Sequence, residues 1–273
     1  MKKNINKIIL YIVNTVFGII TIAPILYALA VSFMPPEQIF SYPPKLIPKE
    51  LYLNNYTDAL NAAPIMKFIV NSFVVSLGVT IGEIFTSCLA AFSFSFFDFK
   101  GKKVLFVIVI ATMMIPAESI MISNYLTVGS FGWLDSYKAL IVPYLSAAMG
   151  IFMMRQYYLT LPRELYEAAK MDGCSNFKFF TRIVFPMSRP IVGSLGVYTF
   201  LVTWNQYLWP LLVTSKDSTR TVQIGISMLQ FSENQSFGLI MAGIIMVLLP
   251  SIIIFIFGQK QLIEGMTSGA VKG

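Results

Sequence analysis

The chain of 273 residues contains no histidine and only two cysteines. Without histidine it lacks the side chain that most often serves as a general base or a metal ligand. Cys88 lies in a long apolar block and Cys174 in a polar segment, and neither has neighbours at metal-ligand spacing. These absences argue against a disulfide, a metal site and catalysis by this chain alone, so a membrane-embedded enzyme is poorly supported.

Charged residues are also scarce. They make up 12% of the chain, whereas hydrophobic residues make up 56%, and a soluble domain has roughly a quarter of its residues charged. A helix rises about 1.5 Å per residue, so about 20 apolar residues cross a hydrocarbon core of about 30 Å. Because lipid offers no hydrogen-bond partners, each such block must be helical. The sequence therefore predicts an all-α integral membrane protein with six transmembrane helices, at 8–33, 68–97, 104–124, 139–160, 190–213 and 238–259.

The first block follows Lys2, Lys3 and Lys7 and imitates a secretory signal with a cleavage site at 28–30. A signal core runs only about 7–15 apolar residues, so we expect an uncleaved first helix, with cleavage as the alternative. No segment between the blocks is long enough to fold alone. We expect a single domain over 1–273, with a core at about 68–260 and a tail at 260–273. Within the proline-rich segment 34–67, residues 54–61 are expected to form a short surface helix.

The positions of the cations predict the orientation. If the N-terminus is inside, 14 of the 20 Lys and Arg residues lie in inner segments, and the outer ones are Lys45, Lys49, Lys67, Lys138, Lys216 and Arg220. The positive-inside rule thus places both termini and the segment 161–190 in the cytoplasm. The net charge of +7 is then explained by topology and lipid headgroups, and no nucleic-acid partner is needed.

Prolines lie in or at the edge of five blocks: Pro24, Pro116, Pro143, Pro210 and Pro250. Membrane helices tolerate proline, and such kinks can also surround a cavity and act as hinges. The sequence alone leaves both readings open.

The segment 161–190 is charged and helix-forming, and it lies between the fourth and fifth blocks. Glu164 and Lys170 suit the two ends of a helix dipole. Gly173 stands where a left-handed terminator belongs, and Ser175 can cap a second helix that runs to about Ile183. One stripe at spacings of three and four comprises Leu165, Ala168, Ala169 and Asp172. This stripe could contact a partner closely, or the helix could lie on the protein's own surface.

The order Glu167-Ala168-Ala169, Gly173, Ile183 and Pro186 resembles the EAA loop of membrane subunits of bacterial ATP-driven importers. Phe185 departs from the usual leucine before the proline. Essentially the whole chain is similar to the second permease subunit of maltose-type carbohydrate importers, through runs at 112–116, 139–144, 204–210 and 265–273. Gln206 stands where relatives commonly place an acid, so a role that depends on that charge does not carry over.

The resemblance implies a type I ATP-binding-cassette importer permease for a sugar or oligosaccharide, in a bacterial cell membrane. Its implied partners are a second homologous permease, two ATPase subunits, an extracytoplasmic solute-binding protein and membrane lipid. The chain has no G-x-x-x-x-G-K-[ST] phosphate loop, so we expect it to bind no cofactor, and ATP and Mg to belong to the ATPases. The implied ATPase-coupling residues are Glu164, Leu165, Glu167, Ala168, Ala169, Asp172, Gly173, Ile183 and Pro186. In the tail, Thr267, Gly269 and Lys272 would reach between the ATPases, with a frayed terminus as the alternative.

Two glutamates fall inside apolar blocks, Glu83 in the second and Glu118 in the third. Ionisable groups at this depth are costly and face the protein interior or a water-filled cavity. They could line a sugar pathway or hydrogen-bond between helices. Since sugars are held by hydrogen bonds and aromatic faces, further candidates are Asn71, Asn124, Asn205, Gln206, Tyr207 and Trp209. A permease for a non-sugar solute, or a stand-alone secondary transporter, remains as an alternative.

Overall fold

In the computed structural model of the chain, the backbone is described for residues 2–230 and 236–267, and side chains for 7–230 and 236–263. Over these ranges the protein consists of helices and connecting segments without a β-strand, which confirms the all-α class. The tail residues Gly269 and Lys272, and the side chain of Thr267, lie outside the described residues.

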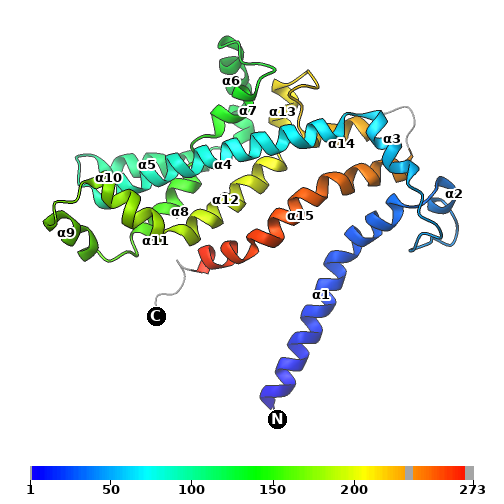
Figure 1. Cartoon of the computed structure of the whole chain (residues 1–273), viewed down its shortest axis with the longest axis horizontal. Coiled ribbons are helices and arrows are strands. Elements are labelled where there is room, and N and C mark those ends of the chain that lie inside the picture. The colour runs from blue at the N-terminus through cyan, green and yellow to red at the C-terminus, as the bar shows by residue number, and fades with distance from the viewer. Residues whose placement is uncertain (1, 231–235, 268–273) are drawn as a thin grey trace. The chain divides into compact units, whose positions relative to one another are not determined.

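The helices shown in Figure 1 include α3, the short helix expected within the proline-rich segment 34–67. Three short turns of other types occur at Thr112–Met114 and Val142–Tyr144 (3₁₀) and at Phe180–Val184 (π). In chain order the α-helices are α1 (Lys2–Ser32), α2 (Pro36–Ile39), α3 (Asn54–Ala62), α4 (Ile65–Phe96), α5 (Lys102–Ala111), α6 (Ala117–Ser130), α7 (Tyr137–Ile141), α8 (Ala148–Tyr158), α9 (Glu164–Met171), α10 (Asn176–Phe179), α11 (Phe185–Met187), α12 (Arg189–Trp204), α13 (Leu208–Val213), α14 (Val222–Gln230) and α15 (Phe237–Thr267).

Three of these helices are long and apolar enough to cross a membrane without a break. They contain Lys7–Ser32, Ile65–Phe96 and Phe237–Ile263, with mean hydropathies of 2.2, 1.8 and 2.9. Pro24 and Pro250 lie inside α1 and α15 without ending them. The first, second and sixth expected spans are therefore continuous helices.

The other expected spans are broken. The chain bends by 100° between Lys102–Met114 and Ala117–Ser130, at Pro116, and by 41° between Tyr137–Tyr144 and Ala148–Tyr158. The expected fifth span divides into α12, of 16 residues, and α13. At about 1.5 Å per residue α12 covers about 24 Å, less than the hydrocarbon thickness of about 30 Å. By length and composition the described helices supply three spans, or five if each bent pair is one, so the count of six stays a prediction.

Backbone contacts divide the chain into two compact units, and the single domain expected from the sequence also stays a prediction. The first unit comprises Met1–Met66 and Gly225–Leu249. In it Asn55, on α3, donates its side-chain amide to the carbonyls of Ser32 and Met34, at 3.0 and 2.9 Å. These two bonds satisfy backbone groups left open at the end of α1 and fix α3 to that end.

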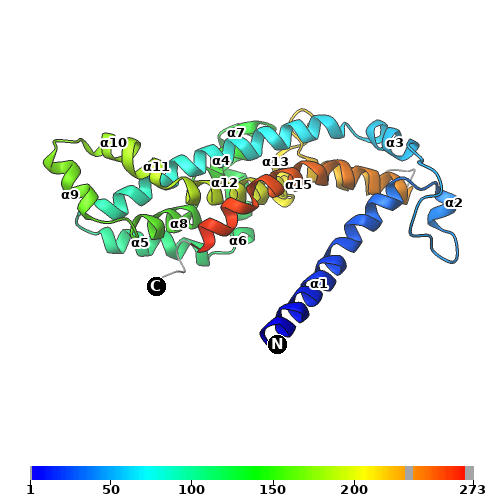
Figure 2. The same ribbon diagram turned by 60° about the horizontal axis from the view of Figure 1, so that its bottom comes forward.

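The second unit comprises Lys67–Ile224 and Pro250–Gly273. In it α4, α8 and α12 lie side by side (Figures 1 and 2). Gly150 on α8 permits the close approach to α4, because a Cβ there would stand 2.4 Å from Ser87 Oγ and 2.8 Å from Glu83 Oε1. Only a glycine leaves the room that this packing requires.

Candidate functional site

The glycine turn of the 161–190 segment has the geometry that the sequence predicts. Gly173 adopts φ +70°, in the left-handed region that side chains disfavour. Its amide donates to the Lys170 carbonyl at 3.0 Å, and the Cys174 amide donates to the Ala169 carbonyl at 2.8 Å. Together these bonds form the double closure of a Schellman C-cap, so α9 ends sharply and the chain reverses.

The second helix begins as expected, because the Ser175 hydroxyl accepts the Lys178 amide at 3.3 Å. It runs further than Ile183, through a π-helical turn and α11 to Met187. Ile183 and Pro186 are half-buried, and Ile183 packs against the core of the second unit. Both residues shape the second helix and present little surface to a partner.

Three of the four residues in the predicted stripe on α9 are exposed, and one is buried. Leu165, Ala168 and Asp172 are exposed, as are Glu164 and Glu167. Ala169 is only 8% exposed and packs in the core together with Tyr166. Ala169 therefore belongs to the inward face of α9, together with Tyr166 three residues before it, and not to the exposed part of the stripe. Its part in ATPase coupling stays a prediction.

Three aromatic rings hold α9 in place, and we call them the aromatic anchor: Phe96, Tyr166 and Phe179. The centroid of Tyr166 lies 5.4 Å from that of Phe96 on α4 and 5.1 Å from that of Phe179 on α10. The Tyr166 hydroxyl also donates to Asn176 Oδ1 at 3.0 Å. Aromatic pairs at such distances contribute about 0.5–1.5 kcal/mol each beyond area burial, so α9 is joined to the C-terminal end of α4.

Two large apolar side chains that the motif does not include flank the glycine turn. Met171 is 84% exposed and Phe177 74% exposed. Both residues lie off the stripe at helical spacing, so the sequence analysis did not single them out. They enlarge the exposed apolar surface at this end of the second unit.

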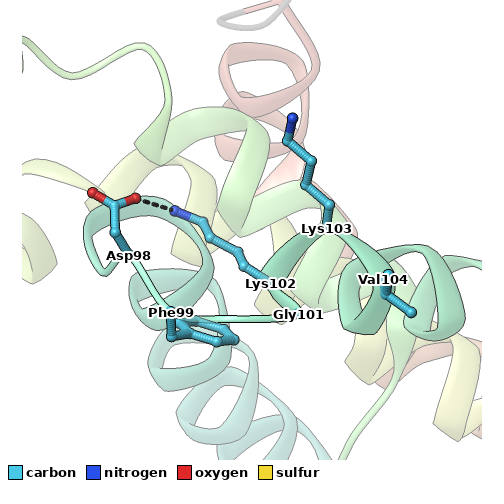
Figure 3. Close-up of a pocket in the computed structure, with 6 residues that line it drawn as sticks. All are labelled: Asp98, Phe99, Gly101, Lys102, Lys103 and Val104. Atoms are coloured by element: carbon cyan, nitrogen blue, oxygen red, sulfur yellow. Dashed lines mark ion pairs between the residues drawn. The ribbon is translucent and has the colours of Figure 1, made fainter.

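The turn between α4 and α5 forms a shallow hollow of about 400 Å³ beside this segment (Figure 3). In it the Lys102 ammonium lies 3.5 Å from the Asp98 carboxylate, while Lys103 points away from both. Asp98 also pairs at 3.4 Å with Arg163, just before α9. Exposed pairs of this kind contribute little, and the cations do not converge on one point, so we regard the hollow as part of a structural joint.

A cavity of about 160 Å³, the Glu83 cavity, lies within the second unit. It adjoins two helix breaks, through Ser146 and Ala147 before α8 and Gln206 after α12. Non-helical backbone at membrane depth is tolerated where it lines a cavity or is buried in protein. The Thr86 hydroxyl donates to the Leu145 carbonyl and so satisfies one group at the first break.

Polar groups from three elements meet in this cavity. Glu83 on α4 is 6% exposed, and its Oε2 accepts the Thr199 hydroxyl of α12 at 3.1 Å. The Gln206 side chain lies beside the Tyr144 hydroxyl, and these two residues form the Tyr144–Gln206 pair of the lining. None of the lining residues is Lys or Arg. In the described side chains no group of three or more Cys, Asp or Glu is placed to hold a metal ion. The carboxylate, hydroxyl and amide groups of the lining suit hydrogen bonding to a polar solute.

Of the eight pathway candidates, the cavity contains Glu83 and Gln206. Asn71 is engaged structurally, since it donates to the Arg220 carbonyl at 2.9 Å and accepts the Tyr137 hydroxyl at 2.7 Å. Trp209 is 2% exposed and donates to the Ala139 carbonyl at 2.9 Å. The remaining four are exposed and do not line the cavity: Glu118, Asn124, Asn205 and Tyr207.

The sequence analysis missed most of the polar lining. Thr199 and Thr203 are four residues apart, which places them on one face of α12. That periodicity in the fifth apolar block was a usable signal. Tyr144 and Ser146 gave no such signal, because their position depends on the break before α8.

A second polar joint links the segment after α6 to the one after α13. Asp135 has φ +56°, and its carboxylate accepts the amides of Ser215 and Lys216 at 2.6 and 2.9 Å. The Ser215 hydroxyl donates to the other oxygen at 2.7 Å. These bonds hold the pKa of Asp135 below its ordinary value.

Comparison with known proteins connects these features to a family. Residues 83–262 match the family model described as the binding-protein-dependent transport system inner membrane component. The arabinooligosaccharides transport system permease protein AraQ of Bacillus subtilis (strain 168) is 38% identical over 228 residues, which cover 83% of this chain and 81% of AraQ.

Two further matches also cover most of the chain. The sn-glycerol-3-phosphate transport system permease protein UgpE of Escherichia coli O1:K1 / APEC is 34% identical over 260 residues, covering 91% of this chain and 92% of UgpE. Among solved structures, a bacterial ABC transporter involved in the import of the acidic polysaccharide alginate matches with a TM-score of 0.85. That match covers 95% of this chain and 97% of the other at 19% identity, so it supports the fold alone.

Proposed function

The chain belongs to the family of inner membrane components of binding-protein-dependent transport systems, and from this premise we propose that it is a translocation subunit of an ATP-driven importer for a sugar or oligosaccharide. The observation that carries the proposal is the polar cavity at two helix breaks, in a chain whose relative AraQ is named for arabinooligosaccharides. The chain would form the pathway together with a second permease, as six spans with both termini in the cytoplasm.

We further propose that the exposed face of α9 docks on an ATPase subunit. Its polar and small residues Glu164, Glu167 and Ala168 remain accessible, while Ala169 and Gly173 set the orientation of the helix from behind. Because the aromatic anchor joins α9 to α4, movement of the ATPase surface would displace α4 as well. ATP and Mg would bind in the ATPases, and this chain would be non-catalytic.

For the tail, we propose that Thr267–Gly273 reaches between the two ATPases. A solute-binding protein outside would deliver the sugar. These partners follow from family membership and are proposals for this chain.

The test is reconstitution of the complex in proteoliposomes with its binding protein, and measurement of ATP hydrolysis across a panel of glycans. We expect a sugar or oligosaccharide to stimulate hydrolysis and to accumulate inside the vesicles. Stimulation only by solutes other than carbohydrates would contradict the sugar assignment. The likeness to UgpE makes sn-glycerol-3-phosphate the first such solute to include.

A further inference from the structure

Glu83 is the single charged residue in the lining of the Glu83 cavity, and within the described side chains it makes no ion pair. Its hydrogen-bond partner is a neutral hydroxyl, that of Thr199 at 3.1 Å. A carboxylate inside a membrane protein normally has a cation or a polar ligand beside it. When the cavity is filled, this carboxylate therefore faces either water or a solute.

The cavity can hold water and a solute. Its volume of about 160 Å³ is well above the roughly 15 Å³ that one water needs. The carboxylate stands at one side, and the Tyr144–Gln206 pair, with Thr203 and Ser146, supplies neutral donors and acceptors. Tyr198 adds an aromatic ring to the lining. This combination suits hydroxyl groups, which can donate to the carboxylate and accept from the amide.

The same lining disfavours an anion. A phosphate or uronate would bring a second negative charge beside Glu83, in a site whose effective dielectric is far below that of water. No lysine or arginine of the lining could offset that repulsion. Discrimination by an unfavourable charge contact is a common route to specificity.

We propose that Glu83 makes this subunit selective for uncharged sugars over phosphorylated or acidic ones. The inference rests on the proposed function, because it assumes that the solute passes the Glu83 cavity. It assigns to this chain a part in substrate choice, in addition to the part of the solute-binding protein.

The test compares a neutral solute with a charged counterpart in the reconstituted complex. Suitable probes are arabinotriose and its reducing-end aldonate, with sn-glycerol-3-phosphate as a second anion. Using one binding protein throughout, the ratio of stimulated ATP hydrolysis for neutral and anionic probes is measured in the wild type and in variants. Any preference of the binding protein for one probe is the same in every measurement, so it cancels when the ratio of a variant is compared with that of the wild type.

In the wild type we expect the neutral probe to be favoured at least about tenfold, which corresponds to about 1.4 kcal/mol. Glu83→Gln keeps the side-chain volume and the acceptor for Thr199, and should reduce the ratio at least threefold. Asp58→Asn, which removes a carboxylate from exposed α3, should leave the ratio unchanged. If the Glu83→Gln variant fails to assemble, Gln206→Glu provides the test. A second carboxylate in the cavity should increase the ratio of neutral to anionic stimulation.

The outcomes separate this inference from the function on which it rests. If no carbohydrate stimulates hydrolysis, the proposed function is wrong. If carbohydrates do so but anionic ones are accepted equally, or the ratio is unaltered in the Glu83→Gln and Gln206→Glu variants, the role of Glu83 is overturned while the importer remains.

Discussion

At the scale of single residues, Gly173 determines the glycine turn after α9 through its backbone conformation. A Cβ at this position would meet no atom within 4 Å, but φ is +70°. Gly173→Leu should therefore cost about 1–2 kcal/mol through backbone strain and shift the two helices that the turn joins. We expect sugar uptake to be lost while the protein remains in the membrane, measured by transport and by immunoblot of membrane fractions. Gly173→Asn, which tolerates this conformation, should retain most uptake, and normal uptake by the leucine variant would contradict the role.

The contact that Asp135 makes with Ser215 and Lys216 should lose stability in acid. Hydrogen bonds from Ser215 and Lys216 lower its folded pKa, whereas an unfolded aspartate has a pKa of about 3.9. The stabilisation is thus fully present above the unfolded value and is lost as the pH falls through the folded pKa. Protection of the Ser215 and Lys216 amides from hydrogen exchange should be constant from about pH 8 to 5 and fall below about pH 4. Asp135→Asn keeps a residue that tolerates positive φ, and it should lower protection at neutral pH and remove the acid step.

Residues whose role depends on the local backbone could be predicted from the sequence. Gly173 and Ser175 act within four positions of the groups that they bind, so turn and cap rules were sufficient. Asn71 and Trp209 were interpreted as pathway residues because they are polar or aromatic in apolar blocks. Asn71 hydrogen-bonds residues 149 and 66 positions away, and Trp209 hydrogen-bonds a residue 70 positions away. No local rule identifies contacts across such separations in the sequence.

At the scale of elements, the attachment of α9 to α4 depends on Tyr166. Tyr166→Ala would remove its ring contacts with Phe96 and Phe179, a change that typically costs about 3–5 kcal/mol for a buried aromatic side chain. We expect α9 to detach, so that sugar-stimulated ATP hydrolysis falls and the 161–190 segment becomes sensitive to limited proteolysis. Tyr166→Phe loses only the bond to Asn176, about 0.5–1.5 kcal/mol, and should behave nearly as the wild type. Equal protease resistance in all three proteins would refute the anchor.

Apolar blocks predicted where helices lie better than where they break. The first, second and sixth blocks became the continuous helices α1, α4 and α15, whereas the fifth block, which is longer than the sixth, divides into α12 and α13. Proline marked the breaks at Pro116 and near Pro143, but it did not break α1 or α15. The break at 205–207 has no proline, and the chain there departs from the helix beside the Tyr144–Gln206 pair, a tertiary contact.

At the scale of the whole molecule, the family was predicted from the EAA order and the C-terminal run, and the comparisons confirm it. The proposed topology is tested by the two cysteines. Cys88 is 1% exposed, and Cys174 is partly exposed beside the glycine turn. An impermeant maleimide should label nothing in intact cells, and in inside-out vesicles stripped of ATPase it should label a site that Cys174→Ser abolishes.

Adding the ATPase back should slow this labelling, because docking on α9 would cover the adjacent turn. Labelling of Cys174 from outside would overturn the orientation. Labelling from inside at an unchanged rate would argue against docking at this surface but leave the orientation intact.

The bond between Glu83 and Thr199 also has a consequence for biosynthesis. The two residues are 116 positions apart, so at roughly 5–20 residues per second Thr199 leaves the ribosome roughly 6–23 s after Glu83. Meanwhile α4, the least apolar of the three continuous candidate spans, carries a lone carboxylate, at a cost on the order of 3 kcal/mol at the centre of a helix. Nascent chains that stop before α12 should therefore insert α4 less completely than chains that include it, and Glu83→Gln should remove that difference. Glu83, to which we assign sugar selection, would thus delay complete membrane insertion of α4 until α12 has been translated.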